Sequence, residues 1–278
     1  MKNLESFKNH PFQVRDDDEM QDLVERINKY GVIEPLIVRP KENGNYEIIS
    51  GHRRKRASEL AHYREIPCII RNVDDDTATI MMVDSNNKRE HLLPSEKAFA
   101  YKMRLDAEKR QGNRTDLTSS PLGTKLENYN TAEKIGEMYG DSKNTVYRYI
   151  RLTELLPEIL NKVDEGIIGF RPAVEISYLN KDNQRLLLDA IEMNDATPTY
   201  SQALKLKELS KENKLTDEMI YSIMEQEKPN QIEKLKLNYD RVDKLLPKTL
   251  KTDKQKEDFI IKCIEEHNQR EKNKSRVR

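Results

Sequence analysis

A run of four basic residues, Arg53 to Arg56, follows Gly51 and His52 in the first third of the chain. Strand-forming residues precede Gly51 and helix-forming residues follow it, so the glycine is expected to join the end of a strand to the start of a helix. At such a junction backbone amides can approach an anion, and the helix N-terminus adds positive potential. The pattern favours binding of a phosphate group, and the alternative is a solvated basic turn.

A second polar cluster lies on a helix expected to follow Ser142, whose side chain suits the N-cap position. The helix before it is expected to run from an N-cap at Thr131 to a tight turn at Gly140. Gly136 is small enough to let the two helices approach closely. On the second helix the inward face is expected to be Val146, Tyr149 and Ile150, and the opposite face Lys143, Asn144, Tyr147, Arg148 and Arg151.

This second helix carries three basic residues and no acidic residue. Such a face suits the major groove of DNA, because Arg and Lys donate hydrogen bonds to acceptors on base edges and phosphates. Asn144 and Arg148 are the candidates for reading bases, while Lys143, Tyr147 and Arg151 are equally suited to phosphates. The alternative is an ordinary helical hairpin with a solvated basic face.

The charge of the whole chain gives DNA binding no support of its own. The 278 residues contain 49 Lys and Arg and 49 Asp and Glu, so any DNA-binding surface must rest on a local cluster of positive charge. Charged residues make up 35% of the chain and hydrophobic residues 36%, which favours about two domains built from small helical units rather than one large core.

Several other classes of protein are disfavoured. The two cysteines, Cys68 and Cys263, lie far apart and have no ligand-like neighbours at metal-site spacing, so reduced thiols are expected. No run approaches the roughly 18 apolar residues of a membrane span. The N-terminus lacks the apolar core of a signal peptide. We therefore expect a cytoplasmic, nucleoid-associated protein.

The surrounding pattern predicts an α+β domain at residues 1–93 and an all-helical domain at 94–228. In the first, helices are predicted at 16–30, at 53–61 and from Asp75, and strands at 36–39, 46–49 and 66–70, with a hairpin turn at Asn43-Gly44. In the second, the pattern predicts a helix at 95–111, a flexible linker at 112–130 and a helix-turn-helix at 131–153.

Residues 229–278 are predicted to be a small C-terminal dimerisation segment. A strand at 235–239 and a short helix at 241–246 precede an amphipathic helix at 254–268. Such a piece is too small to be stable alone, so it is expected to pair with a second copy; the alternative is packing on its own chain. A frayed basic tail is expected over 267–278. The residues expected to form the contact between the two copies are Phe259, Ile260, Cys263 and Ile264 of the amphipathic helix.

Several ordered motifs resemble the ParB/Noc partition family. Residues 10–15, 31–39, 51–54 and 65–67 resemble the N-terminal domain of that family, in the same order and with similar spacing. Residues 86–90 are similar to its Asn-x-x-Arg-Glu phosphate segment. The resemblance covers roughly residues 7 to 180, and several motifs together are much more specific than any one alone.

This resemblance implies an N-terminal fold shared with sulfiredoxin and a pocket for CTP and Mg²⁺. By position, Gly51, Arg53 and Arg54 would hold the phosphates, and Asn86 and Arg89 would complete the polyphosphate and metal side. It also implies a homodimer that loads on double-stranded DNA at a palindromic centromere-like site, slides as a nucleotide-gated clamp and works with a partition ATPase.

The chain departs from the family pattern at four positions. His52 and Glu34 stand where the family commonly has Glu and Gln. Ser85 replaces the acidic residue usually found before the Asn, and that carboxylate is associated with metal handling and hydrolysis; CTP hydrolysis is therefore expected to be slow or absent. Arg171 is displaced by one residue from the Arg that contacts DNA in the family.

Three functions remain open from the sequence. The first is a partition-type clamp gated by a nucleotide. The second is a transcriptional regulator or nucleoid-occlusion-like factor without a role in segregation. The third is an enzyme that acts on a nucleotide or nucleic acid through the N-terminal domain, but the sequence offers no metal triad or nucleophile–base pair for it.

Overall fold

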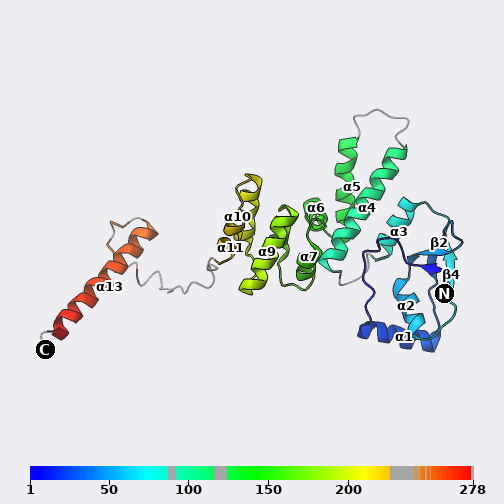
Figure 1. Ribbon diagram of the computed structural model, residues 1–278, viewed down its shortest axis with the longest axis horizontal. Helices are drawn as coiled ribbons and strands as arrows, with labels where there is room; N and C mark the ends of the chain where they lie inside the picture. The colour runs from blue at the N-terminus through cyan, green and yellow to red at the C-terminus, as the bar shows by residue number, and fades with distance from the viewer. Residues whose placement is uncertain are drawn as a thin grey trace. The chain divides into compact units, whose positions relative to one another are not determined.

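The structure, a computed structural model, describes residues 1–86, 92–115, 124–225, 242, 245–247, 249–250 and 252–276. The chain forms two compact units, Met1–Gln226 and Glu227–Arg278. The first unit contains a small sheet and most of the helices (Figure 1). The fold class predicted from the sequence, α+β with a mostly helical remainder, is confirmed. The predicted boundary between residues 93 and 94 lies within the first unit and stays a prediction.

The sheet has four strands in the order β1-β3-β2-β4. The central strands β2 and β3 form an antiparallel hairpin, whose turn places Gly44 at a φ of 81°. The outer strands run parallel to their neighbours. The bounds are β1 (Leu4–Glu5), β2 (Leu36–Pro40), β3 (Tyr46–Ser50) and β4 (Cys68–Ile70). Short runs of strand-forming residues predict three of these strands, but β1 is too short to produce a pattern.

Three helices accompany the sheet. Helix α1 (Asp18–Tyr30) begins at Asp17, whose side chain accepts a hydrogen bond from the Met20 amide, and it ends before Gly31. It packs against α2 (His52–Leu60). Helix α3 (Asp75–Asn86) packs on β3 and begins at Asp75 as predicted, and Ser85 and Asn86 belong to its last turn.

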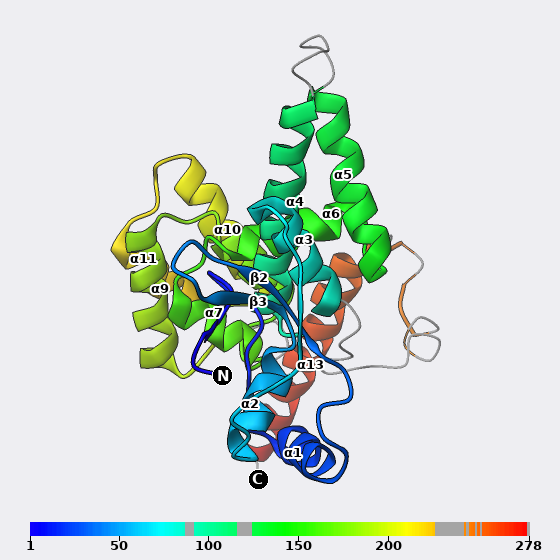
Figure 2. The same cartoon turned by 90° about the vertical axis from the view of Figure 1, so that its right-hand side faces the viewer.

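The helical part of the first unit begins with α4 (Pro94–Thr115), which packs against α3 and lies beside α5 (Figure 2). The apolar core of this helical part includes Leu152, Ile159, Ile176 and Leu187, all fully buried. The remaining helices are α5 (Thr124–Tyr139), α6 (Lys143–Leu152), α7 (Pro157–Asp164), α8 (Phe170–Ile176), α9 (Lys181–Asn194), α10 (Tyr200–Lys211) and α11 (Asp217–Glu225).

The flexible linker predicted at 112–130 is partly wrong. Helix α4 continues to Thr115 and α5 begins at Thr124. Thr131 therefore lies inside α5 and does not cap it. Polar residues suggested a loop, but packing of α4 against α5 stabilises helical backbone where local propensity is weak.

The second unit contains α13 (Asp253–Arg276), which confirms the predicted amphipathic helix and continues through most of the predicted frayed tail. A hollow of about 370 Å³ lies beside it, lined by Val242, Leu245, Leu246, Phe259, Ile260, Cys263, Ile264 and His267. The predicted strand at 235–239 lies outside the described residues. Over the part of the chain that the structure describes, no helix has the length and apolarity to cross a membrane.

Candidate DNA-binding and nucleotide-binding sites

The turn between α5 and α6 brings the two helices into very close contact. Gly140 adopts a φ of 69°, and the Asp141 amide donates to the Gly136 carbonyl at 2.8 Å. A Cβ atom on Gly136 would lie 2.3 Å from the Asp141 carbonyl oxygen. Only glycine fits there, so the predicted close approach at Gly136 is confirmed.

Helix α4 holds this turn through the carboxylate of Asp141. The Tyr101 hydroxyl donates to Asp141 Oδ2 at 2.5 Å, and Lys97 Nζ lies 2.6 Å from the same oxygen. Burial and the bond to Asp141 raise the pKa of Tyr101, so its hydroxyl stays a donor. No local sequence pattern predicts these contacts, because 40 residues separate Tyr101 from Asp141.

Helix α6 begins as predicted. The Ser142 side chain accepts a hydrogen bond from the Thr145 amide, and Val146 is fully buried against Ala132, Ile135 and Tyr101. Because that side of the helix is buried, the opposite side can meet a partner. The exposed residues on it are Ser142, Asn144, Tyr147 and Arg148, with Lys143 partly exposed.

Two further candidates for DNA binding lie near α8. Arg171 is exposed in the first turn of α8. Arg151 Nη2 donates to the Ser177 carbonyl at 2.7 Å, and its guanidinium lies over the ring of Tyr178. The described contacts of Arg151 are thus within the protein, and they tie the end of α6 to the segment after α8.

The predicted phosphate turn has the expected backbone. Gly51 follows β3 directly and adopts a φ of 106°, and a Cβ atom there would lie 2.8 Å from Leu36 Cγ. No side chain caps α2, and its first turn contains no acidic residue. This backbone and the positive end of the helix dipole suit an anion, and the phosphate site itself stays a prediction.

Arg53 and Arg54 are held beside this turn by groups of the same chain. Arg53 Nη2 lies 3.3 Å from Asp17 Oδ1 and 3.1 Å from Glu19 Oε2. Arg54 Nη1 donates to the carbonyls of Glu34 and Pro35 at 2.6 and 3.0 Å. These contacts link α2 to the start of α1 and to the segment before β2, and each side chain keeps about a quarter of its surface exposed.

His52 takes part in a different contact. Its ring lies 3.8 Å from the ring of His10, centroid to centroid, and its Nε2 atom accepts from the Phe7 amide at 3.4 Å. His52, which stands where the family commonly has Glu, thus links the N-terminal segment to the start of α2.

The other half of the predicted pocket lies at the end of α3. The Asn86 amide nitrogen donates to the Met82 carbonyl at 2.9 Å, and the Ser85 hydroxyl donates to the same carbonyl. Asp84 forms an ion pair with Arg104 of α4, so one of its carboxylate oxygens is engaged within the protein. Arg89 lies outside the described residues. Within the described ranges, no hydrogen bond or ion pair joins Asn86 to Gly51, Arg53 or Arg54.

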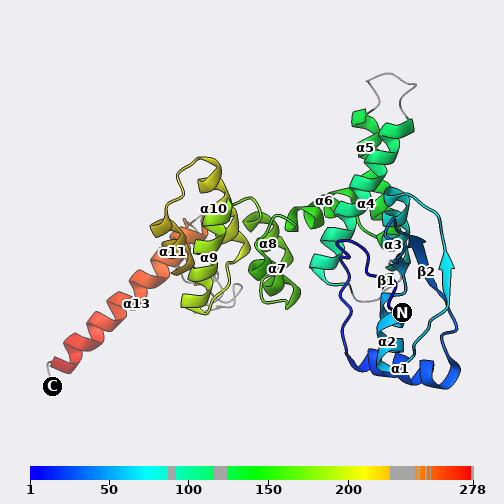
Figure 3. The ribbon, with the colours of Figure 1, turned by 45° about the vertical axis from the view of Figure 1, so that its right-hand side comes forward.

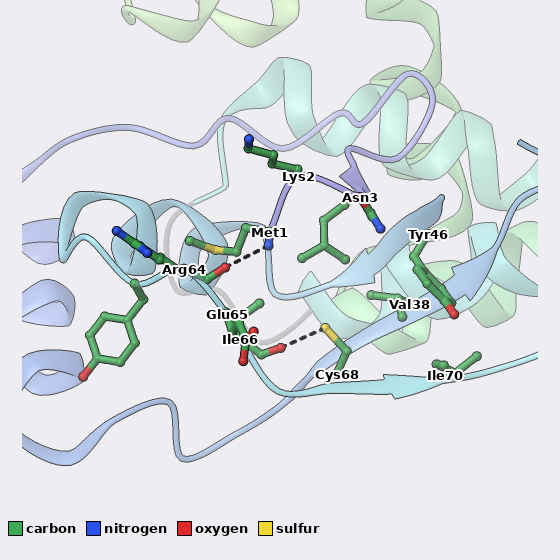
Figure 4. A pocket seen from close by; sticks show the side chains of 12 residues that line it. Met1, Lys2, Asn3, Val38, Tyr46, Arg64, Glu65, Ile66, Cys68 and Ile70 are labelled. Carbon is green, nitrogen blue, oxygen red and sulfur yellow. Dashed lines mark hydrogen bonds between the residues drawn. The ribbon is translucent and has the colours of Figure 1, made fainter. Parts of the chain in front are cut away.

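A large open hollow of about 910 Å³ lies elsewhere, over one face of the sheet (Figure 4). The Met1 amino group donates to the Arg64 carbonyl at its rim, and Cys68 lies beside Ile66. None of the predicted site residues lines it. Its lining is Met1, Lys2, Asn3, Leu4, Val38, Tyr46, Tyr63, Arg64, Glu65, Ile66, Cys68 and Ile70.

Comparison with known proteins identifies the family. The family model for the ParB N-terminal domain matches residues 1–87. The nucleoid occlusion protein of Geobacillus thermodenitrificans (strain NG80-2) is 31% identical over 202 residues, which cover 71% of this chain and 64% of the relative. Residues 1–87 of this chain belong to the ParB N-terminal domain family. The probable chromosome 1-partitioning protein ParB of Deinococcus radiodurans is 33% identical over 195 residues, covering 70% of this chain and 60% of the relative.

The chain therefore spans less than two thirds of the length of these relatives. Among solved structures it is similar to the C-terminally truncated ParB of Caulobacter crescentus. The structure complexed to the centromeric parS site is 22% identical, with a TM-score of 0.43, and covers 74% of this chain and 96% of that chain. A structure of the same protein with CTP-γ-S is 24% identical, with a TM-score of 0.30, and covers 66% and 92%.

Proposed function

We propose that this chain is a sequence-specific DNA-binding protein of the partition type that binds a palindromic centromere-like site as a homodimer. The observation that carries this proposal is the exposed, acid-free face of α6, presented on a turn in which only glycine fits at position 136. A rigid, capped helix of this kind can place Asn144 and Arg148 against base edges in the major groove. Ser142, Lys143, Tyr147, Arg151 and Arg171 would contact the phosphate backbone.

The proposed nucleotide is CTP, held at the start of α2. The support is the resemblance of residues 51–54 to the family motif, together with the left-handed backbone of Gly51 at the end of β3 and a helix whose own first turn contains no acidic residue. Arg53 and Arg54 lie beside that turn, and each keeps about a quarter of its side chain exposed. When bound, CTP would supply a triphosphate whose charge the amides of α2 and these guanidinium groups would hold.

A magnesium ion would reach this pocket mainly through the phosphates. Mg²⁺ keeps several water ligands and needs few protein oxygens, and the Asn86 carbonyl oxygen is the proposed one; Arg89 would assist on the phosphate side. Among the residues that the structure describes, no three His, Cys, Asp or Glu side chains form a metal-binding group. With Ser85 in place of a carboxylate and Asp84 paired with Arg104, hydrolysis would be slow or absent.

The proposed partners are double-stranded DNA, a second copy of this chain and a partition ATPase, which would associate the protein with the nucleoid. The dimer is supported by the apolar hollow beside α13, where Phe259 and Ile264 lie. The proposed domains are residues 1–93 for the nucleotide, 94–228 for DNA and 229–278 for dimerisation.

A second candidate function is a nucleoid-occlusion-like factor or transcriptional regulator without a role in segregation. The observation that favours it is the similarity to nucleoid occlusion proteins at 31% identity. Both functions use the same DNA-reading helix. They differ in where the sites lie in the genome and in whether a partition ATPase acts on the protein.

The test is binding of the full chain to a library of genomic fragments, with and without CTP and Mg²⁺. Enrichment of a palindrome is expected, and CTP should move protein from that palindrome onto neighbouring DNA when the fragment ends are blocked. Sites clustered near one origin would favour partition, whereas dispersed sites would favour nucleoid occlusion or regulation. Absence of any enriched sequence would contradict the DNA-binding proposal.

A further inference from the structure

Three cations from two helices surround the ring of Tyr178, which lies just after α8. The Arg151 guanidinium carbon is 4.3 Å from the ring centroid, Lys207 Nζ is 4.1 Å away, and Lys211 Nζ is 6.0 Å away. Arg151 belongs to α6, and both lysines belong to α10. Tyr178 is 44% exposed, so the cluster is at the surface.

Two of the cations are fixed in place. Arg151 donates to the Ser177 carbonyl, and Lys207 forms an ion pair of 2.5 Å with Glu175 in which both side chains are largely buried. Lys211 is exposed, like Tyr178 itself. Among the described contacts of this cluster, one carboxylate, that of Glu175, pairs with one of the three cations, which leaves a positive excess next to an exposed aromatic residue.

The cluster continues the surface proposed for DNA. On α6, Arg148 is exposed and lies one turn before Arg151. On α8, Arg171 is exposed and lies one turn before Glu175. Helix α8 contacts both α6 and α10, and the three helices follow one another in Figure 3. Positive side chains thus extend from the DNA-reading helix across α8 to α10.

We propose that Tyr178 and Lys211 form a second DNA contact, which binds a phosphodiester group beside the base pairs that α6 reads. The Lys211 ammonium and the Tyr178 hydroxyl are suitable donors to a phosphate oxygen. Arg151 and Lys207 hold the ring and add positive potential. The contact rests on the proposed DNA-binding function, and it lengthens the DNA segment that one copy of the chain covers.

The test measures the affinity of the full-length Lys211→Gln variant for the enriched palindrome and for random duplex at several salt concentrations. Removing one phosphate contact should weaken both affinities by a similar factor. The negative slope of log affinity against log salt should become less steep, by about 0.9 for each copy of the chain that binds. Lys205→Gln is the matched control, because Lys205 is exposed on the same helix and has no described contact with Tyr178. It should keep the wild-type slope.

Two variants of Tyr178 separate the ring from its hydroxyl. Tyr178→Leu should reduce affinity for both DNAs with a thermal unfolding midpoint near that of the wild type, because it removes the ring that positions the cations. Tyr178→Phe keeps the ring and should lose only the hydroxyl contribution. An unchanged salt slope in Lys211→Gln, measured on a wild type that does bind DNA, would overturn this inference alone. A wild type that binds no DNA would instead overturn the proposed function.

Discussion

The Tyr101 hydroxyl donates a hydrogen bond of 2.5 Å to the carboxylate of Asp141, and this bond joins α4 to the turn of the helix-turn-helix. Tyr101 is fully buried and also meets the ring of Tyr139 edge-on, 4.8 Å between centroids. Tyr139 packs both with the core around α3 and with the core of the helix-turn-helix. The position of α6, the helix proposed to read DNA, therefore depends on α4, the helix that also packs against α3.

These two tyrosines should respond oppositely to removal of the hydroxyl group. Tyr101→Phe should lower the free energy of unfolding by about 1.5–3 kcal/mol, because it removes a bond to a charged acceptor. The Tyr139 hydroxyl is buried and makes no hydrogen bond within the described part of the chain. Tyr139→Phe should therefore be neutral or stabilising. Urea unfolding of both variants checks this, and equal losses would contradict it.

The buried Tyr139 hydroxyl also predicts that the free energy of unfolding decreases at alkaline pH. Burial raises the pKa of Tyr139 from 10.0 to about 12. Because the folded protein holds this proton more tightly than the unfolded chain, the stabilisation is complete below pH 10 and is lost as the pH rises toward 12. Tyr139→Phe should lose less stability than the wild type across this interval. Unfolding curves at several pH values provide the measurement, and parallel losses would show that Tyr139 does not titrate in this range.

Gly136→Ala should destabilise the protein, against the usual effect of this change in a helix. Gly→Ala normally stabilises a helix interior by about 0.8–1.0 kcal/mol. Here the added Cβ would lie 2.3 Å from the Asp141 carbonyl oxygen, so the turn must move. We expect a loss of about 1–3 kcal/mol and weaker specific DNA binding. Glu137→Ala, at the exposed neighbouring position, is the control. A variant as stable as the wild type would refute the close contact.

Arg148→Ala should lower affinity for the specific site by about 1–3 kcal/mol and affinity for random DNA far less, if Arg148 reads a base. The reason is its exposed position in the middle of the polar face of α6. Fluorescence anisotropy with both duplexes gives the comparison. Arg185→Ala removes the same charge at an exposed position of α9 and should leave both affinities near those of the wild type. Equal losses on both duplexes would assign Arg148 to a phosphate.

Arg54→Ala should abolish binding of CTP with Mg²⁺, because polyphosphate affinity at the start of α2 requires a positioned guanidinium group. Arg54→Lys should also bind weakly, since an ammonium group cannot bridge the carbonyls of Glu34 and Pro35 as the guanidinium does. Arg56→Ala on the same helix is the control, because Arg56 pairs with Asp16. Calorimetry measures CTP binding.

Site-specific DNA binding should survive in all three of these variants, which shows that they fold. If Arg54→Ala binds CTP as the wild type does, the pocket lies elsewhere. Ser85→Glu should raise phosphate release in a protein that binds CTP. If phosphate release does not increase, the missing carboxylate at position 85 is not the reason for slow hydrolysis.

Removal of residues 229–278 should yield a monomer in sedimentation. It should bind a two-half-site palindrome more weakly, because one copy then provides half of the contacts. Ile264→Lys is the matched point variant in the full chain, since Ile264 is 53% exposed beside the apolar hollow and a charge there opposes pairing. A truncated chain that remains a tight dimer would place the interface in the first unit.

Patterns within short stretches of sequence determined most of the elements that carry the site. Short runs of strand-forming residues predict β2 and β3, and Gly51 between strand-forming and helix-forming residues predicts the start of α2. Ser142 predicts the N-cap of α6, and Gly136 predicts the close turn. Helix caps, tight turns and amphipathic faces depend on residues a few positions apart, and the sequence displays such spacing directly.

The tertiary structure alone decided which distant groups meet. Asp141 binds Tyr101, Arg54 binds the carbonyls of Glu34 and Pro35, and Arg151 lies against Tyr178. The extent of α5 into the predicted linker was also set by packing against α4. Such contacts join residues that are tens of positions apart, and any one charged residue has many partners of suitable chemistry along the chain. Only the packed arrangement of helices brings one of them within hydrogen-bond distance.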